Sequence, residues 1–327
     1  MAVTKQNRCE LCGSPANIVM SNLYIETPTI LSEPLSDRLG KPVWLKLENL
    51  QPSGSFKLRG IALLCQHEVA GGARGLVSSS GGNAGIAVAY VGRKLSLPVR
   101  VVVPETTTEV ARRLIRAQGA ELLVHGASWY EADIYARQSL SAHEAFIHPF
   151  DHPLLWQGHS TMMDEAARDA VKPGAVVLSV GGGGLLCGAV AGMQQLGWSD
   201  VPILAMETGG AESFALALAA GEVTQLPAIT SVASSLGARQ VCDQALLSAR
   251  EHSVISQVIS DAAALRACDI LLNDHRIMVE PACGAAVAAV TESSEHLAGV
   301  ESVLVIVCGG ATMTAARLRK LLDDSEV

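Results

Sequence analysis

The chain has 327 residues, of which 49% are hydrophobic, 17% charged and only 4% aromatic. This length is enough for one large domain or two domains of medium size. The formal net charge is -8 and Lys and Arg are not clustered, so nucleic acid and anionic membranes are excluded as expected partners.

Short apolar runs alternate with helical patterns along nearly the whole chain. The sequence predicts strands at Val43–Leu47, Gly75–Ser78, Val99–Val103, Glu121–Val124, Ala175–Val180, Pro202–Met206 and Ser302–Val307. It predicts helices at Leu58–Val69, Asn83–Leu95, Glu109–Gln118, Ser128–Ser141, Leu185–Leu196, Ala262–Leu272 and Pro281–Thr291. The alternation indicates an α/β fold, with mostly parallel sheets covered by helices.

We expect two sheets, because 327 residues are many for a single one. The segment Glu144–Pro153, which contains two prolines, is the expected crossing between them. The uncharged stretch 174–199 is broken by a run of glycines, so we expect no membrane span. Ligands of open parallel sheets bind at the carboxyl ends of the strands, and glycine-rich loops follow several of those ends here.

The eight cysteines lie mostly in apolar patterns, where a free thiol packs as a small hydrophobe. No signal peptide is recognised, so we expect a reduced, cytoplasmic protein. Cys9 and Cys12 form an isolated Cys-x-x-Cys pair. Because a structural zinc ion takes four ligands, we interpret residues 1–20 as a loose tail and not as a metal site.

Four consecutive glycines, Gly181 to Gly184, follow a predicted strand and open the next helix. Backbone N–H groups at such a helix start favour a phosphate. The lysine that a P-loop requires is absent. A dinucleotide site would need Gly-x-Gly-x-x-Gly and an acid after the next strand. Glu207 has that position, but the glycine spacing is one residue out of register, so a nicotinamide enzyme stays an alternative.

Two further loops end predicted strands. The loop Ser80–Ala84 offers hydroxyl and N–H groups at a helix start, which suit a carboxylate, and Asn83 either caps that helix or points at a ligand. The last predicted strand ends in Cys308-Gly309-Gly310, which places a thiol at the expected ligand crevice. Taken alone, such a cysteine is more often just a buried residue of the core.

Lys57 opens the first long helical pattern, in the string Ser53-Gly54-Ser55-Phe56-Lys57. The positive end of a helix dipole disfavours an ammonium group and favours a neutral amine. A neutral amine is a nucleophile that forms Schiff bases with aldehyde cofactors. A surface lysine on an ordinary helix is the alternative that Lys57 alone leaves open.

In their order, Ser-Phe-Lys, Ser-x-Gly-Asn, the glycine tetrad and the C-terminal Cys-Gly-Gly resemble the fold-type II pyridoxal-phosphate enzymes. Within these enzymes the chain is similar to the serine dehydratase group, over about Glu26 to Leu322. The resemblance implies a two-domain fold like the tryptophan synthase β chain. Residues 1–47 and 152–327 would form a large cofactor-binding domain, and residues 48–151 a small substrate-side domain.

The resemblance also implies roles for particular residues. Lys57 would hold pyridoxal 5'-phosphate as a Schiff base and act as the general base, with Phe56 beside the ring, Asn83 on the ring hydroxyl and Cys308 at the ring nitrogen. The cofactor phosphate would contact Gly181, Gly182, Gly183, Gly184 and Leu185. The substrate carboxylate would contact Ser80, Gly81, Asn83 and Ala84. A monovalent cation such as K+ would lie among Gly181, Glu207, Ala211, Ser213, Leu236 and Ala238.

The implied reaction is β-elimination of L-serine to pyruvate and ammonia, and of L-threonine to 2-oxobutanoate, in a homodimer. Gly81 stands where related racemases carry a serine that acts as second base, which argues against racemisation. Cys308 stands where β-replacement enzymes carry Ser or Thr. Threonine deaminase-led activity stays a further alternative, although the biosynthetic enzyme carries a regulatory extension. An NAD-dependent dehydrogenase is the distant alternative.

Overall fold

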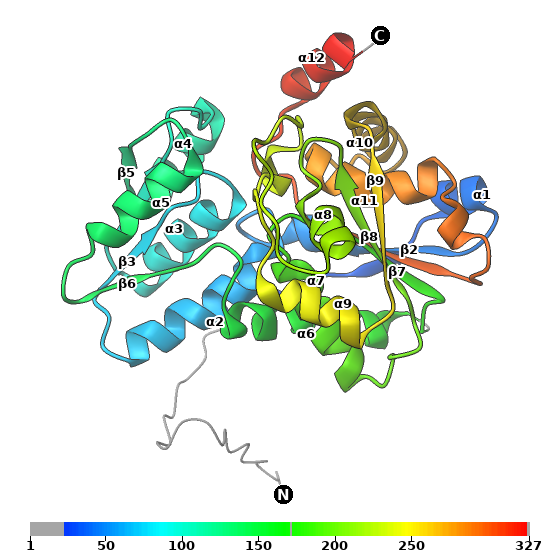
Figure 1. The fold of residues 1–327 in the computed structure, drawn as a ribbon, viewed down its shortest axis with the longest axis horizontal. Coiled ribbons are helices and arrows are strands. Elements are labelled where there is room, and N and C mark those ends of the chain that lie inside the picture. Colours follow the sequence, from blue (N-terminus) through cyan, green and yellow to red (C-terminus); the bar gives the residue numbers. More distant parts are fainter. Residues whose placement is uncertain (1–22, 171, 326–327) are drawn as a thin grey trace, which may run out of the picture.

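The computed structural model describes residues 23–170 and 172–325, so Cys9 and Cys12 and the predicted loose tail lie outside the described residues. The chain forms two sheets that lie side by side, each with its own helices (Figure 1). This confirms the predicted α/β fold with two mostly parallel sheets.

The larger sheet has six strands in the order β1-β2-β10-β7-β8-β9. Their bounds are β1 Thr29–Leu31, β2 Val43–Leu47, β7 Ala175–Ser179, β8 Ile203–Thr208, β9 Val254–Ile259 and β10 Val303–Val307. All neighbours are parallel except β1 and β2, which are antiparallel. The strands β2 and β10, which lie toward opposite ends of the chain, are thus paired inside the sheet.

The smaller sheet has four parallel strands in the order β5-β4-β3-β6. Their bounds are β3 Gly75–Ser78, β4 Val99–Val103, β5 Glu121–Val124 and β6 Glu144–Phe146. They all fall between residues 75 and 146, on the left of Figure 1. The division into domains at residues 47/48 and 151/152 stays a prediction.

All seven predicted strands are confirmed, and three strands were missed. Two of these, β1 and β6, are only three residues long, which is too short for a recognisable alternation. The third, β9, contains Ser256 and Gln257 and lies at a sheet edge. The predicted crossing segment therefore needs a correction, because its first residues, Glu144–Phe146, add the strand β6 to the smaller sheet.

Twelve helices cover the sheets in the part of the chain that is described. Those beside the smaller sheet are α2 Lys57–Ala70, α3 Asn83–Leu95, α4 Glu109–Ala117 and α5 Trp129–Gln138. Those of the larger sheet are α1 Glu33–Leu39, α6 Pro153–Asp169, α7 Gly184–Gln195, α8 Ser213–Ala220, α9 Asp243–Glu251, α10 Asp261–His275, α11 Pro281–Thr291 and α12 Ala315–Ser325. The described residues also form three short 3-10 helices, η1 Glu48–Leu50, η2 Ser234–Leu236 and η3 Glu295–Leu297.

Local sequence explains where many of these helices begin. A side-chain hydroxyl accepts a hydrogen bond from the first helical turn at Ser32, Thr108, Ser128 and Ser260. The interior has one large apolar cluster for each sheet, built mainly from Val, Ala, Leu and Ile, and a small third cluster of Val77, Val102, Ala132 and Ala136. Among residues 23–170 and 172–325, none of the helices combines the length and hydropathy needed to cross a bilayer.

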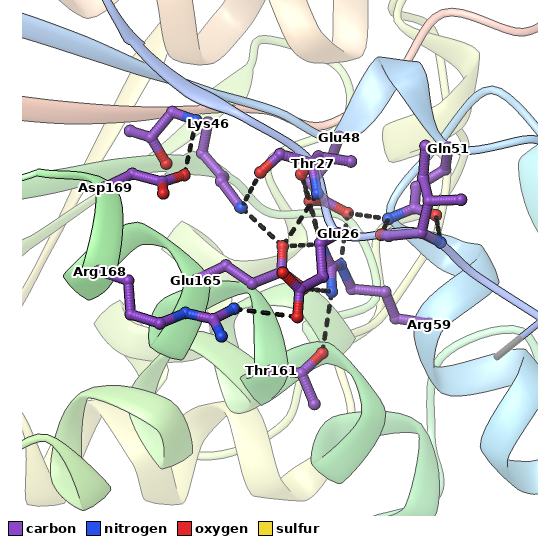
Figure 2. Close-up of polar contacts among 12 residues, drawn as sticks. Glu26, Thr27, Lys46, Glu48, Gln51, Arg59, Thr161, Glu165, Arg168 and Asp169 are labelled. Atoms are coloured by element: carbon purple, nitrogen blue, oxygen red, sulfur yellow. Dashed lines mark hydrogen bonds and ion pairs between the residues drawn. The ribbon is translucent and has the colours of Figure 1, made fainter.

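A buried cluster of charged side chains joins β2, α2 and α6 (Figure 2). The Nε of Arg59 donates to Glu48 at 2.7 Å, and its Nη1 donates to Glu165 at 2.6 Å. The Nζ of Lys46 donates to Glu165 at 2.7 Å and to the Thr27 carbonyl at 2.5 Å. Two cations face two carboxylates, so the charges in this buried cluster balance. The cluster holds the first turn of α2 against α6.

We expect Arg59→Ala to lower the free energy of unfolding by about 3–5 kcal/mol, because Glu48 and Glu165 would keep buried charges without their main partner. Urea denaturation of the purified protein measures this. Arg168→Ala is the control, because Arg168 pairs with Glu26 on the exposed surface, and we expect its midpoint to stay that of the parent. Equal midpoints for the two variants would contradict the role given to the cluster.

Candidate active site

The loop before α2 lies against the segment that follows β10. The Phe56 N–H donates to the Cys308 carbonyl at 3.0 Å, and Ser55 forms an isolated antiparallel bridge with Gly309. A Cβ on Gly309 would lie 2.6 Å from the Cβ of Ser55, so this contact requires glycine. The structure thereby brings Lys57 and Cys308, which are far apart in the sequence, into one site.

Lys57 is the first residue of α2, where the sequence predicted it. Its Nζ donates to the Pro149 carbonyl at 2.7 Å. The same atom lies 5.1 Å from the ring centroid of Phe56 and 6.0 Å from that of Phe150. The amine is therefore held between the start of α2 and the crossing segment.

Burial lowers the pKa of Lys57 to about 8, although Coulombic interactions with Cys308, Cys242 and Glu280 act in the opposite direction. Desolvation disfavours the ammonium form because a charge loses more hydration than a neutral amine does. A much larger fraction of Lys57 is consequently neutral near pH 8 than in an ordinary lysine. A neutral amine can act as a nucleophile and as a base.

The glycine tetrad connects β7 to α7, and α7 begins at Gly184, one residue earlier than predicted. Gly183 is the N-cap residue, with φ of 92°, and no described side chain caps this helix. The N–H groups of the first turn have no partner within a helix, and the dipole favours an anion beside them. The start of α7 is thus suited to a phosphate, as the sequence indicated.

Close packing also explains why these residues are glycines. A Cβ on Gly182 would lie 2.4 Å from the ring of Phe150, and one on Gly184 would lie 2.7 Å from the Phe150 carbonyl oxygen. A Cβ on Gly183 would lie 2.5 Å from the Cβ of Ala245. The loop therefore fits between the crossing segment and α9 only without side chains, and Phe150 links the loop to the surroundings of Lys57.

Asn83 does not cap α3, so the interpretation of this residue as a helix cap is wrong. The N-cap residue is Gly82, and the Nδ2 of Asn83 donates to Glu280 at the start of α11. Glu280 also accepts from the Thr312 hydroxyl at 3.1 Å. The Oδ1 of Asn83 is buried and has no hydrogen-bond partner among the described residues. It is available to a ligand that carries a hydroxyl.

The loop before α3 is fixed by its own contacts. The Ser80 hydroxyl accepts from the Gly82 N–H at 3.3 Å. A Cβ on Gly81 would lie 2.5 Å from the Oγ1 of Thr107, so the Thr107 side chain occupies the space beside this glycine. Ala84 is buried in the first turn of α3. Ser80 and Gly81 stay partly exposed, which leaves them accessible to a substrate.

Cys308 is buried at the end of β10. A hydrogen bond with Cys283 and burial raise the pKa of the Cys308 thiol well above its usual range. The group that Cys308 presents to the site is therefore a neutral thiol. A neutral thiol can contact an unprotonated ring nitrogen without adding charge.

Glu207 lies at the end of β8, fully buried, and its carboxylate caps α8. Its oxygens accept from the Phe214 and Ala215 N–H groups, each at 2.8 Å. Burial raises the pKa of Glu207 to about 7, while these N–H donors act to lower it. Both oxygens are engaged within the chain, which argues against the ribose-binding role of a nicotinamide site.

Several of the other residues of the predicted cation site contact one another. The Ser213 hydroxyl donates to the Gly181 carbonyl at 3.5 Å, and a Cβ on Gly181 would lie 3.0 Å from the Cα of Leu236. The Ala238 N–H donates to the Leu236 carbonyl at 2.7 Å, and Ala211 lies in the turn before α8. Within the described ranges, no group of three or more His, Cys, Asp or Glu side chains could hold a metal ion.

Sequence reasoning missed three groups that position the site. The Pro149 carbonyl accepts a hydrogen bond from Lys57, and the Glu280 carboxylate accepts one from Asn83. The third group is the Phe150 ring, which packs against the glycine tetrad. The only local signal was the proline-rich character of the crossing segment. A backbone carbonyl has no sequence signature, and the pairing of Asn83 with Glu280 spans 197 residues.

The site and fold define a class of protein. Residues 20–309 match the family described as pyridoxal-phosphate dependent enzyme, and the chain belongs to this family. This confirms the resemblance to fold-type II pyridoxal-phosphate enzymes.

The similarity extends to particular relatives. The chain is 48% identical to the serine dehydratase-like protein of Rattus norvegicus, over 90% of this chain and 93% of that protein. It is 44% identical to the L-serine dehydratase/L-threonine deaminase of Mus musculus, over 92% of this chain and 95% of that protein. The structure of a fungal L-serine ammonia-lyase from Rhizomucor miehei matches with a TM-score of 0.88 and 34% identity, over 93% of this chain and 99% of that one.

We expect imine formation between the cofactor-free protein and pyridoxal phosphate to speed up as pH rises, with a midpoint near pH 8. The neutral fraction of Lys57 grows through its pKa of about 8, and not through the ordinary 10.5. The visible absorbance of the imine measures the rate at each pH. Lys57→Arg should remove the transition. A rate that is flat from about pH 7 to 9 would refute the lowered pKa.

Proposed function

We propose that the protein is an ammonia-lyase that uses pyridoxal phosphate to convert L-serine to pyruvate and ammonia, and L-threonine to 2-oxobutanoate and ammonia. The observation that carries this proposal is the buried Lys57 amine, with its pKa of about 8, held beside Cys308 and the glycine tetrad. The activities named for the mouse and fungal relatives support the same reaction.

The residues present fit this cofactor on three observations. The start of α7 has no side-chain cap from the described residues, as a bound phosphate requires. Lys57 can be neutral, as imine formation with an aldehyde requires. The Oδ1 of Asn83 is buried without a partner in the part of the chain that is described, as an acceptor for the ring hydroxyl would be.

The proposed contacts to the cofactor follow from these positions. Lys57 holds the aldehyde carbon, Phe56 lies beside the ring, Asn83 meets the ring hydroxyl and Cys308 meets the ring nitrogen. The phosphate is held by Gly181, Gly182, Gly183, Gly184 and Leu185. The substrate carboxylate is held by Ser80, Gly81, Asn83 and Ala84, where the dipole of α3 favours an anion.

When bound, pyridoxal phosphate supplies an aldehyde for the substrate amine and a ring that withdraws electrons from Cα. Lys57 then takes the proton from Cα as general base. Holding the substrate carboxylate at the start of α3 orients that proton toward Lys57. The Pro149 carbonyl accepts a hydrogen bond from the Lys57 amine and keeps it in place.

Two residues favour elimination over the alternatives. A carboxylate at the ring nitrogen would keep that nitrogen protonated and make the ring a strong electron sink. The neutral thiol of Cys308 does not do so. Less negative charge then builds up at Cα, which favours loss of the β-hydroxyl. Gly81 offers no group that could return a proton to the opposite face of Cα, so racemisation is disfavoured.

We also propose a K+ ion among Gly181, Glu207, Ala211, Ser213, Leu236 and Ala238, which combine a buried carboxylate with a serine hydroxyl and backbone carbonyls. Such oxygen ligands suit a hard cation. The remaining proposals are a homodimer, a cytoplasmic location and a small substrate-side domain formed by residues 48–151.

The purified protein with pyridoxal phosphate should show a visible absorption band and release pyruvate from L-serine. Borohydride reduction should fix the cofactor to the peptide that contains Lys57, as read by mass spectrometry. Lys57→Ala should lose the band and the pyruvate together, because it removes the amine that is proposed to hold the aldehyde. A band that survives in Lys57→Ala would sink the cofactor assignment. A normal band without pyruvate would instead refute serine as the substrate.

Replacing K+ by tetramethylammonium should reduce pyruvate release several-fold, and adding K+ should restore it, because Glu207 would lose its counter-charge near the glycine tetrad. Glu207→Ala should lose the response to K+. Glu222→Ala, which changes an exposed carboxylate just after α8, should keep it. A parent protein that is equally active in both salts would remove the cation from the proposal.

A further inference from the structure

Two thiols lie together beside the glycine tetrad. Cys187 is in the first turn of α7, and Cys242 is the N-cap residue of α9. Their Sγ atoms are 3.8 Å apart. The side chains are 3% and 4% exposed, respectively. Neither thiol has a part in the proposed deamination.

The two thiols differ in their surroundings. In the hydrogen bond between the two Sγ atoms, either thiol can be the donor. With Cys187 donating, this bond and one from the Ala245 N–H in the first turn of α9 lower the pKa of Cys242, although burial acts to raise it. The same hydrogen bond and burial raise the pKa of Cys187. Cys242 is therefore the thiol of the pair that gives a thiolate, and a thiolate is the form that reacts with oxidants.

A surface hollow of about 290 Å³ between α6, α7 and α9 reaches one thiol of this pair. Its wall includes Cys187, together with Trp156, Gln157, Gln194, Gln244 and Ser248. A water molecule takes about 30 Å³ in the liquid, so the hollow admits a molecule as small as hydrogen peroxide. The oxidant thus has a route to Cys187, whose Sγ lies 3.8 Å from that of Cys242.

We propose that Cys187 and Cys242 are a redox modification site, which hydrogen peroxide converts to an intramolecular disulfide. The Cys242 thiolate attacks one peroxide oxygen, the O–O bond breaks, and a sulfenic acid and water form after proton transfer. The Cys187 sulfur then attacks the sulfur of Cys242, the S–S bond forms, and a second water leaves. Two thiols are oxidised, and one peroxide is reduced to two waters.

The backbone couples this pair to the glycine tetrad. The Cys187 N–H donates to the Gly183 carbonyl, and the Cys242 N–H donates to the Gly182 carbonyl, each at 3.0 Å. A Cβ on Gly183 would lie only 3.3 Å from the Cys242 Sγ, so little space separates the two segments.

A disulfide bond is about 2.05 Å long, so the two sulfurs must approach from their present 3.8 Å. The starts of α7 and α9 then shift toward each other and pull the carbonyls of the tetrad with them. The N–H groups that face the phosphate move out of position, and the oxidised protein holds pyridoxal phosphate less tightly. This consequence rests on the proposed cofactor site, whereas the disulfide itself does not.

The test uses the full chain, treated with hydrogen peroxide and then alkylated. Peptide mass spectrometry should find Cys187 linked to Cys242, with two thiols lost per chain, and dithiothreitol should restore both. Cys187→Ala and Cys242→Ser should each form no such link. Cys65→Ala, which removes a buried thiol of α2 outside the pair, should oxidise like the parent.

In the second measurement, the dissociation constant for pyridoxal phosphate, followed by absorbance, should rise about tenfold on oxidation in the parent and stay constant in Cys187→Ala. Oxidation of other cysteines while this pair stays reduced would overturn the modification site. A disulfide that leaves the dissociation constant unchanged would overturn its coupling to the tetrad. A reduced protein that binds no pyridoxal phosphate would refute the proposed function, and the peptide map would still decide the disulfide.

Discussion

The active site depends on one backbone contact, the hydrogen bond from the Phe56 N–H to the Cys308 carbonyl, with the bridge of Ser55 to Gly309 beside it. This contact joins the start of α2 to the end of β10, a strand of the larger sheet. Arg59, two residues after Lys57, anchors the same helix to α6 through buried ion pairs. Lys57 is therefore held from both sides, and its lowered pKa follows from that burial.

The glycine tetrad shows how packing and chemistry impose the same residue type. An anion site at the start of α7 needs free N–H groups, and the contacts with Phe150 and Ala245 leave no room for a Cβ. Phe150 also lies near the Lys57 amine. A change in the loop that moves Phe150 therefore changes the surroundings of the amine. The backbone N–H groups of Cys187 and Cys242 donate to carbonyls of the same loop, so both proposals involve the tetrad.

Some features of the site could be predicted because their signal is local. The start of α2 at Lys57, the start of α3 at Asn83 and the glycine loop before α7 each combine a break in periodicity with a short motif. The role of Asn83 was harder to predict, since a side chain at a helix start commonly caps that helix. Only the structure shows that Asn83 donates to Glu280 instead. The short strands β1 and β6 carried too few residues for any pattern to appear.

By itself, the sequence determined the α/β order of elements, seven of the strands, the family and the position of Lys57 at a helix start, because each is encoded in neighbouring residues. Only the tertiary structure decided that the Pro149 carbonyl holds Lys57, that Phe150 fills the space beside Gly182, and that two thiols 55 residues apart meet. The physical reason is that these contacts join segments whose separation in the chain says nothing about their distance in space. A carbonyl, a ring face or a thiol carries no sequence signal of its partner.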